Sequence, residues 1–394
     1  MKIGIFNSNI DNIAEGDASA AVLADSLASE HQTEIICVPR STTAEQLRIL
    51  SGSSLQQVAF RTVAEPPQLT SDPNDPGRRY QALRNWSNEV TRHYDLFITF
   101  CDRVPIYCSA PRGVVVIRFP HDFIPSLYRA FWLEHLASYQ LMLSNSYYTQ
   151  FWTRVFWEID CPVVYPPVSY RTAMIAKENL IVSAGPFETA CPQKQLELIS
   201  AFKQLKRQLP DWSLTIIGEL GGNPASKTYF EAVCDAAKDS DVTVLANPNV
   251  DEQFEIFNRG RLFWLAAGLD KELQYQPERA IPFSLHLIQA MAAGCVPLAP
   301  NAGGLSEVLR HGENGFFWDT TTELIERSVL LARDENGRLG LAKAARLRAL
   351  DFRPERFTES FRRHLKVTFG IRAGFRVAPL RLWKRLIAST RPTP

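Results

Sequence analysis

The chain has 394 residues, of which 45% are hydrophobic and 22% charged, and its formal net charge at neutral pH is +1. These values are close to the globular average, so they exclude a disordered or low-complexity chain. Because the net charge is close to zero, nucleic acid is not expected as a partner; proteins that bind it usually carry an excess of basic residues. Because the length is large for one hydrophobic core, we expect two domains.

Cysteine usage and the N-terminus bear on the compartment. The seven cysteines are odd in number and never spaced as CxxC, which favours a reduced, cytoplasmic protein and predicts no metal site. The opening residues MKIGIFNSN are typical of a first strand, not of a signal peptide. No stretch approaches the roughly 18 apolar residues of a membrane span, so any membrane contact is expected to be peripheral.

Short apolar runs alternate with segments of helical period in the first part of the chain. This alternation is typical of βαβ units and a parallel sheet. We predict helices over residues 17–29 and 79–92. The predicted strands span residues 3–6, 33–38, 58–60, 96–100, 114–119 and 141–143. Together they indicate an N-terminal Rossmann-like domain over residues 1–168.

A proline pair, Pro166-Pro167, ends that series, and we place the domain linker there because prolines stiffen the chain and cannot continue a central strand. The next predicted strands, each separated by a helix, span residues 180–183, 214–217, 242–245, 262–265 and 296–299. They predict a second doubly wound domain over residues 169–350. Open parallel sheets bind ligands at the carboxyl ends of their strands, so the two domains are expected to face each other across a cleft.

The C-terminal region has two parts. Helical spacing from 357 to 365 predicts a last helix within residues 351–370. Residues 371–394 contain six basic residues and no acidic one, and on a helical wheel the apolar and basic side chains of 380–387 separate into two halves. This pattern is typical of an interfacial helix, so we expect residues 371–394 to bind a membrane surface. Packing of the tail on a partner or on its own domain is the alternative.

One segment carries a specific resemblance. Residues 289–307 read QAMAAGCVPLAPNAGGLSE and are followed by GENG at 312–315. This segment resembles the donor-binding half of glycosyltransferase family 4, whose members read Glu-Ala-Met-Ala-Ala-Gly, then a strand, then Gly-Gly and Glu. Further segments of the chain are similar to that family: SNSYYTQFW at 144–152, VYPPV at 164–168, PDWSLTIIG at 210–218, NPNVDE at 247–252 and FWLAAG at 263–268.

The resemblance covers about residues 1–370 and is closest to the branch with lipid-linked-oligosaccharide mannosyltransferases and bacterial polysaccharide enzymes. It implies the GT-B fold, an α/β architecture of two Rossmann-like domains, with the last helix crossing back to the first domain. It also implies a retaining hexosyltransferase that moves a sugar from a UDP- or GDP-linked nucleotide sugar to a glycan or lipid-linked acceptor in polysaccharide or glycolipid assembly. No cofactor is implied, and the expected place is the cytoplasm, peripheral at the inner face of the membrane.

The family's site residues can be carried onto this chain. A retaining transferase holds the diphosphate with backbone N–H groups at glycine-rich turns and helix N-termini, and with basic side chains. The implied catalytic residues are Arg118 and His121. The implied donor-binding residues are Gly16, Asp17, Gly185, Lys194, Gly218, Glu219, Ser284, His286, Gln289, Gly303, Gly304 and Glu307.

Several donor-site positions depart from the family. Its two acidic residues fall on Ile281 and Gln289, and of these only the glutamine can hydrogen-bond a ribose. Its basic pair falls on Pro186 and Gln193, which leaves Lys194 one residue away. A second hypothesis therefore stands beside the enzyme: a catalytically inactive GT-B protein acting as a glycan-binding or scaffold subunit.

Six of the implied site residues also have a structural interpretation. Asp17 is a plausible helix N-cap, and His286 a core histidine. Lys194 fits an exposed helix charge, Glu307 a bond within its own loop, and Gly303 with its neighbour a tight turn.

Overall fold

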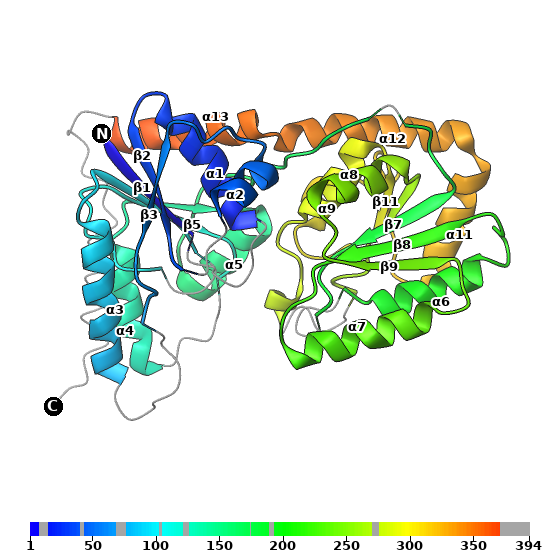
Figure 1. The fold of residues 1–394 in the computed structure, drawn as a ribbon, viewed down its shortest axis with the longest axis horizontal. Helices are drawn as coiled ribbons and strands as arrows, with labels where there is room; N and C mark the ends of the chain where they lie inside the picture. The colour runs from blue at the N-terminus through cyan, green and yellow to red at the C-terminus, as the bar shows by residue number, and fades with distance from the viewer. Residues whose placement is uncertain are drawn as a thin grey trace. The chain divides into compact units, whose positions relative to one another are not determined.

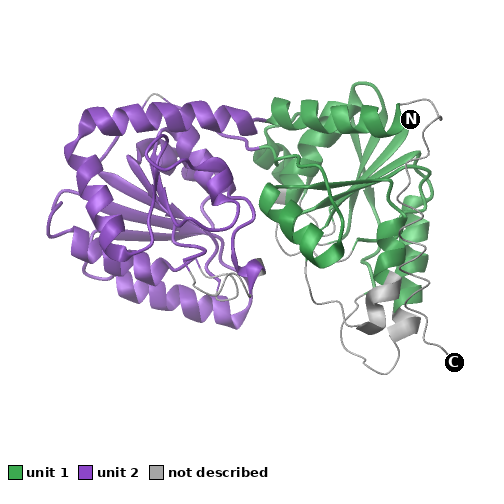
Figure 2. Ribbon diagram, turned by 180° about the vertical axis from the view of Figure 1, so that it is seen from behind, with its two compact units in different colours: residues 1–167, 354–394 green, residues 168–353 purple. Residues whose placement is uncertain are grey.

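The structure is a computed structural model that describes residues 1–7, 15–39, 43–67, 76–101, 105–120, 126–173, 175–188, 193–269 and 276–370. The chain divides into two compact units, coloured separately in Figure 2. The first unit is Met1–Pro167 with the segment that begins at Pro354, and the second is Val168–Arg353. Each unit is described by itself.

The first unit is built on a parallel sheet with the strand order β3-β2-β1-β4-β5-β6. Its strands are β1 (Lys2–Asn7), β2 (Gln32–Cys37), β3 (Val58–Thr62), β4 (Leu96–Cys101), β5 (Gly113–Ile117) and β6 (Leu141–Ser144). Its helices are α1 (Glu15–Ala28), α2 (Ala44–Ser51), α3 (Pro76–Thr91), α4 (Ser126–Ala137), α5 (Tyr147–Trp157) and α13 (Pro354–Phe369). Helices α1, α2 and α13 lie over one face of the sheet, and α3 and α4 over the other (Figure 1).

The second unit repeats this plan with the strand order β12-β11-β10-β7-β8-β9. Its strands are β7 (Leu180–Ala184), β8 (Ser213–Gly218), β9 (Val242–Ala246), β10 (Leu262–Trp264), β11 (Val296–Ala299) and β12 (Phe316–Phe317). Its α-helices are α6 (Gln195–Leu205), α7 (Pro224–Ala237), α8 (Val250–Arg259), α9 (Leu285–Ala293), α10 (Leu305–Val308), α11 (Thr321–Arg333) and α12 (Glu335–Ala349). Two short 3-10 turns, Pro277–Arg279 and Leu350–Phe352, complete it.

Both sheets follow from continuous apolar runs. All residues of β4, β5, β7 and β11 are buried, as expected for strands covered by helices on both faces. In each sheet the strand order reverses beside the first strand of the unit, between β1 and β4 and between β7 and β10. Such a reversal opens a crevice at the carboxyl ends of the strands, where doubly wound proteins bind ligands.

The predicted α/β fold class is confirmed, and each predicted strand is present with bounds shifted by up to two residues. The strand expected to reach residue 119 ends at Ile117. Strand β12 (Phe316–Phe317) was not predicted, because two residues are too few to show a period. The tail 371–394 lies outside the described residues. Within the described ranges, no helix combines the length and apolar character needed to cross a membrane.

The last helix, α13, packs into the first unit although it follows the second unit in sequence. Phe357 and Phe361 are buried in the same apolar cluster as strand β1 and helix α1. On its outer side, Arg362 donates from Nη1 to Glu30 Oε1 at 2.6 Å and from Nε to Ser26 Oγ at 3.0 Å. The helix is therefore an integral part of the first unit's core.

We predict that Phe361→Ala lowers the free energy of unfolding by about 3–5 kcal/mol, because it leaves a cavity in this core. The matched control on the same helix is Val367→Ala, at an exposed position, which should change stability by less than about 0.5 kcal/mol. Urea unfolding followed by circular dichroism measures both. Equal stability of the two variants would show that α13 is not anchored as described.

Candidate functional site

Two glycines meet at the carboxyl ends of β7 and β8. Gly185 follows β7 directly and Gly218 is the last residue of β8. A Cβ added to Gly218 would lie 2.0 Å from the carbonyl oxygen of Gly185, so no side chain fits there. The two backbones therefore approach closely at this edge, which is the reason for glycine at residue 218.

Lys194 stands at the N-cap of α6, the helix that follows β7. Its backbone is left-handed, with φ 54°, and its side chain makes no cap hydrogen bond to the helix. Lys194 thus supplies no side-chain acceptor to the first turn of α6, unlike the N-cap residues of seven other helices of the described chain, Thr43, Ser146, Asn223, Asn249, Ser284, Thr320 and Asp334. Uncapped N–H groups at a helix start favour binding of an anion.

The loop between β7 and α6 is held by a residue that sequence reasoning missed. Gln195 is buried, and its amide nitrogen donates to the carbonyl oxygens of Gly185 at 3.3 Å and Pro186 at 3.1 Å. Its amide oxygen accepts from the Tyr229 hydroxyl at 3.0 Å. Gln193, where the family has its lysine, is also buried and packs beside Gly185. The sequence Gln193-Lys194-Gln195 contains no signal for either contact.

Glu219 follows β8 at the same edge. Its side chain is largely exposed, yet desolvation of the carboxylate by nearby protein raises its pKa, and the charge of Glu188 adds to the increase. Its carbonyl oxygen accepts from the Phe187 N–H at 2.8 Å. Two acidic side chains therefore lie close together at this edge, and one of them takes up a proton more readily than a free glutamate.

Helix α9, between β10 and β11, places three of the predicted residues. Ser284 caps its N-terminus and accepts from the Leu287 N–H at 3.2 Å, which is a structural role. His286 is partly buried near the Phe257 ring, and burial lowers its pKa to about 4. The imidazole is therefore neutral near pH 7, so it can hydrogen-bond but adds no positive charge for a phosphate.

Gln289 lies one turn further along α9, and its amide is already engaged within the unit. Its oxygen accepts from Gln253 Nε2 at 2.9 Å, and its nitrogen donates to the Ser169 carbonyl at 3.2 Å. An amide side chain has two N–H donors and two oxygen lone pairs, so one of each is left for a further hydrogen bond. The residue thus joins α8 and α9 to the start of the unit, and its contact with a donor ribose stays a prediction.

The turn at Gly303 and Gly304 is pressed against the loop that precedes α9. A Cβ on Gly303, which has φ +57°, would lie 2.5 Å from the Ile281 carbonyl oxygen, and one on Gly304 would lie 1.8 Å from that of Pro282. The Gly304 N–H donates to the Ile281 carbonyl at 3.0 Å. Ile281 therefore stabilises the turn through its backbone carbonyl, although its side chain is apolar.

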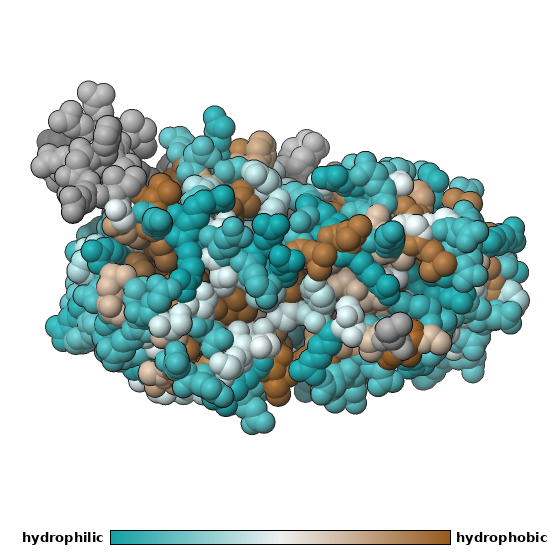
Figure 3. All heavy atoms as spheres, turned by 90° about the horizontal axis from the view of Figure 1, so that it is seen from above, coloured by the Kyte–Doolittle hydropathy of each residue, from teal (hydrophilic) through white to brown (hydrophobic). Residues whose placement is uncertain are grey.

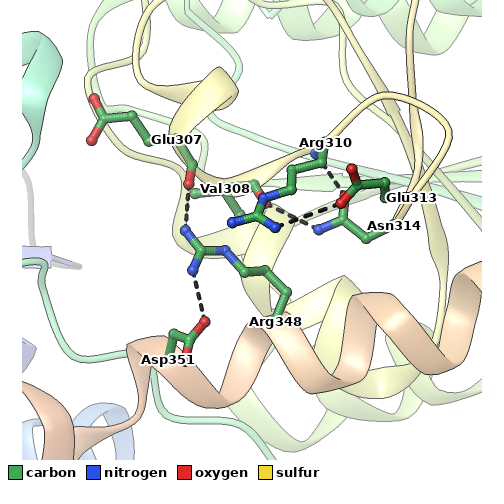
Figure 4. A network of polar contacts seen from close by, with 7 residues as sticks. All are labelled: Glu307, Val308, Arg310, Glu313, Asn314, Arg348 and Asp351. Atoms are coloured by element: carbon green, nitrogen blue, oxygen red, sulfur yellow. Dashed lines mark hydrogen bonds and ion pairs between the residues drawn. The ribbon is translucent and has the colours of Figure 1, made fainter.

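Figure 4 shows how the segment after this turn is held. Arg348 of α12 donates from Nη2 to the Glu307 carbonyl at 2.5 Å and from Nη1 to Asp351 Oδ2 at 2.7 Å. Asn314 donates to the Val308 carbonyl at 3.2 Å. The carboxylate of Glu307 points away from Arg348, so its backbone is fixed while its side chain stays outside this network. No motif marked Arg348, some forty residues downstream.

Two predicted residues of the first unit, Gly16 and Asp17, lie beside Asn7 at the end of β1. Helix α1 begins at Glu15, so the interpretation of Asp17 as an N-cap is wrong. Asp17 instead accepts from Asn7 Nδ2 at 2.7 Å, and a Cβ on Gly16 would lie 2.7 Å from Asn7 Oδ1. Arg118 follows β5 at the same edge, and its carbonyl accepts from the Thr149 hydroxyl at 2.8 Å. His121 lies outside the described residues.

Residues 172–348 match the model of the family described as glycosyl transferases group 1. This match covers less than half of the chain and lies within its second unit. The site described above, from Gly185 to Arg348, lies wholly within the matched residues. In the second unit, the described residues contain no group of three or more His, Cys, Asp or Glu side chains placed to hold a metal ion.

A curated relative and several solved structures are similar to this chain. D-inositol 3-phosphate glycosyltransferase of Pseudarthrobacter chlorophenolicus is 29% identical over 156 residues, which are 39% of this chain and 34% of the relative. HepE of Anabaena, solved with UDP-glucose, aligns with a TM-score of 0.65 and 14% identity over 93% of this chain and 100% of its own. A glycosyltransferase from Rickettsia africae aligns with a TM-score of 0.67 and 12% identity over 94% and 99%. The fold is therefore GT-B.

We predict that Gly304→Ala destabilises the second unit by about 1–3 kcal/mol, because a methyl group cannot lie 1.8 Å from a carbonyl oxygen without moving the loop. The control is Gly340→Ala on α12, where an added Cβ meets no atom within 4 Å. That change should stabilise the helix by roughly 0.5–1 kcal/mol. Chemical unfolding measures both, and a Gly304→Ala variant as stable as the wild type would contradict the described packing.

Proposed function

We propose that this protein is a glycosyltransferase that transfers a sugar from a nucleotide-sugar donor held by the second unit. The match of residues 172–348 to the model of glycosyl transferases group 1 supports the class of reaction. The observation that carries the proposal is the carboxyl edge of the second sheet. There the start of α6, whose N-cap residue makes no side-chain cap, adjoins Gly185 and Gly218, which have no side chains to block a ligand. Such an edge suits a diphosphate, which needs N–H donors and close backbone approach.

In this proposal the residues have separate roles. The N–H groups of the first turn of α6 and the Lys194 side chain would bind the diphosphate. His286 and Gln289, on the first two turns of α9, would bind the sugar or ribose hydroxyl groups as neutral partners. Arg118, at the carboxyl end of β5 in the first unit, is the proposed catalytic residue. The structural neighbours solved with UDP and UDP-glucose make a uridine nucleotide the first donor to test.

The finer parts of the proposal concern the acceptor and the place of action. We propose a retaining transfer to a glycan or lipid-linked acceptor in polysaccharide or glycolipid assembly, at the cytoplasmic face of a membrane. The basic tail supports a membrane-bound acceptor by its composition. Deleting residues after Gly370 should then weaken binding of the protein to anionic vesicles while the two units stay folded, as measured by co-sedimentation and circular dichroism.

A second candidate function is a catalytically inactive GT-B protein that binds a glycan or a partner. A specific observation favours it: the Gln289 amide and the Gly304 N–H, both expected at the donor, are bonded within the unit. Ile281 and Pro186 further reduce the polar groups available to a leaving nucleotide. The two functions differ in whether any nucleotide binds.

Calorimetric titration of the full chain with UDP, GDP and their sugars tests the proposal, and we expect micromolar binding of one nucleotide. Lys194→Ala should weaken it by roughly ten- to a hundredfold, because a hydrogen bond to a charged group is worth about 1.5–3 kcal/mol. Gln289→Ala should weaken it by only about two- to tenfold, as for one neutral bond.

Lys203→Ala, an exposed lysine on the same helix α6, is the matched control and should bind as the wild type does. No binding across the panel by folded protein would favour the inactive candidate. Binding that survives Lys194→Ala unchanged would overturn the assignment of the diphosphate site.

A further inference from the structure

Helix α12 of the second unit has an unusual distribution of side chains. Its inward side buries Arg338 and three small residues, Ala342, Ala345 and Ala349, and Leu341 packs partly buried against the core. Its outward face carries three large apolar residues, since Leu339 is 50% exposed, Leu347 60% and Leu350, just past its end, 40%. An ordinary surface helix has the reverse arrangement, with leucines inward and polar residues outward.

The inward alanines have a physical reason. Helix α9 offers Ala290, Ala293 and Gly294 on its own buried surface, and small residues on both helices allow close packing. Arg346 donates to the Ala293 carbonyl at 3.2 Å, and a Cβ on Gly294 would lie within 2.4 Å of its guanidinium. This packing requires alanines inside. It does not require leucines outside, so their presence on the outward face needs another explanation.

The outward leucines form one stripe with basic residues among them. At 100° per residue, Leu339, Leu347 and Leu350 fall within an arc of about 80°, and Lys343 lies inside that arc. Exposed Arg346 flanks it. The stripe is about 16 Å long. Figure 3 looks onto the side along which α12 runs in Figure 1, and it shows brown apolar groups set among teal polar ones.

The charge of this face is of one sign. Residues 336–350 contain four basic residues and no acidic one. The acids at the two ends are paired, Glu335 with Arg338 at 3.4 Å and Asp351 with Arg348 at 2.7 Å. Arg338 is itself buried and Arg348 is paired, so the positive charge next to the exposed leucines comes from Lys343 and the exposed Arg346.

We propose that the outward face of α12 (Leu339, Lys343, Leu347 and Leu350) docks on an anionic lipid surface. Separate leucines with lysine between them suit the boundary of a bilayer, where apolar side chains enter the acyl region and the ammonium group reaches back to the headgroups. The positive charge of the face complements anionic headgroups. The proposal concerns α12 alone, and it rests neither on glycosyl transfer nor on residues 371–394.

The test is co-sedimentation of the full chain with vesicles of phosphatidylcholine alone and of phosphatidylcholine mixed with phosphatidylglycerol. We expect binding only to the mixed vesicles. The double variant Leu339→Gln/Leu347→Gln should weaken it by roughly tenfold or more, because two apolar side chains no longer enter the bilayer. Lys343→Gln should weaken it by about fivefold, as expected for one basic residue at an anionic surface.

Two matched controls lie away from this face. Leu245→Gln changes a leucine that is 39% exposed on β9, the edge strand at the other end of the sheet from β12. Lys203→Gln changes an exposed lysine on α6. Both variants should bind the mixed vesicles as the wild type does. Circular dichroism of each variant confirms that the fold is retained.

Hydroxyl-radical footprinting of the wild type on the same vesicles separates α12 from any other membrane contact of the chain. Leu339 and Leu347 should become at least severalfold less reactive, while Leu245 stays unchanged. Equal reactivity of the α12 leucines with and without vesicles would overturn the proposal, as would vesicle binding unaffected by the double variant. A leucine-dependent dimer in light scattering, without vesicle binding, would assign the face to a second copy instead.

Discussion

The second unit depends on backbone approaching backbone where no Cβ fits. At the ends of β7 and β8, Gly218 meets the carbonyl of Gly185, and beyond β11 Gly304 meets the carbonyl of Pro282. The first contact sets the path of the chain into α6, and the second fixes the loop that leads into α9. Both helices begin at the carboxyl edge of the sheet, so the two contacts decide which N–H groups and side chains reach that edge.

The supports around these contacts are side chains that bind backbone carbonyls. Gln195 holds Gly185 and Pro186, Arg348 holds Glu307, and Gln289 holds Ser169. Each places a polar side chain against a backbone carbonyl of the irregular chain, which helps to satisfy the hydrogen-bonding capacity of that carbonyl. These hydrogen bonds hold the edge in place without many charged groups. This agrees with the sequence analysis, which predicts few charged side chains for binding the donor.

The sequence was sufficient for the fold because its strands are covered on both faces and therefore read as continuous apolar runs. The glycine positions also followed from the motif, since Gly303-Gly304 lies four residues beyond a predicted strand. The functions of Asp17 and Gln289 did not follow, because their partners Asn7 and Gln253 come from other elements and have no fixed spacing from them. Arg348 was missed for the same reason. Side-chain partners across elements depend on packing, which a single sequence does not display.

The central claim is that a nucleotide diphosphate binds at the carboxyl edge of the second sheet, at the start of α6. A crystal structure of the full chain with the nucleotide that binds in solution tests it most directly. The account predicts diphosphate density within hydrogen-bond distance of the N–H groups of the first turn of α6 and of Lys194, close to Gly185. Density for the nucleotide elsewhere, with the start of α6 occupied only by water, would contradict it.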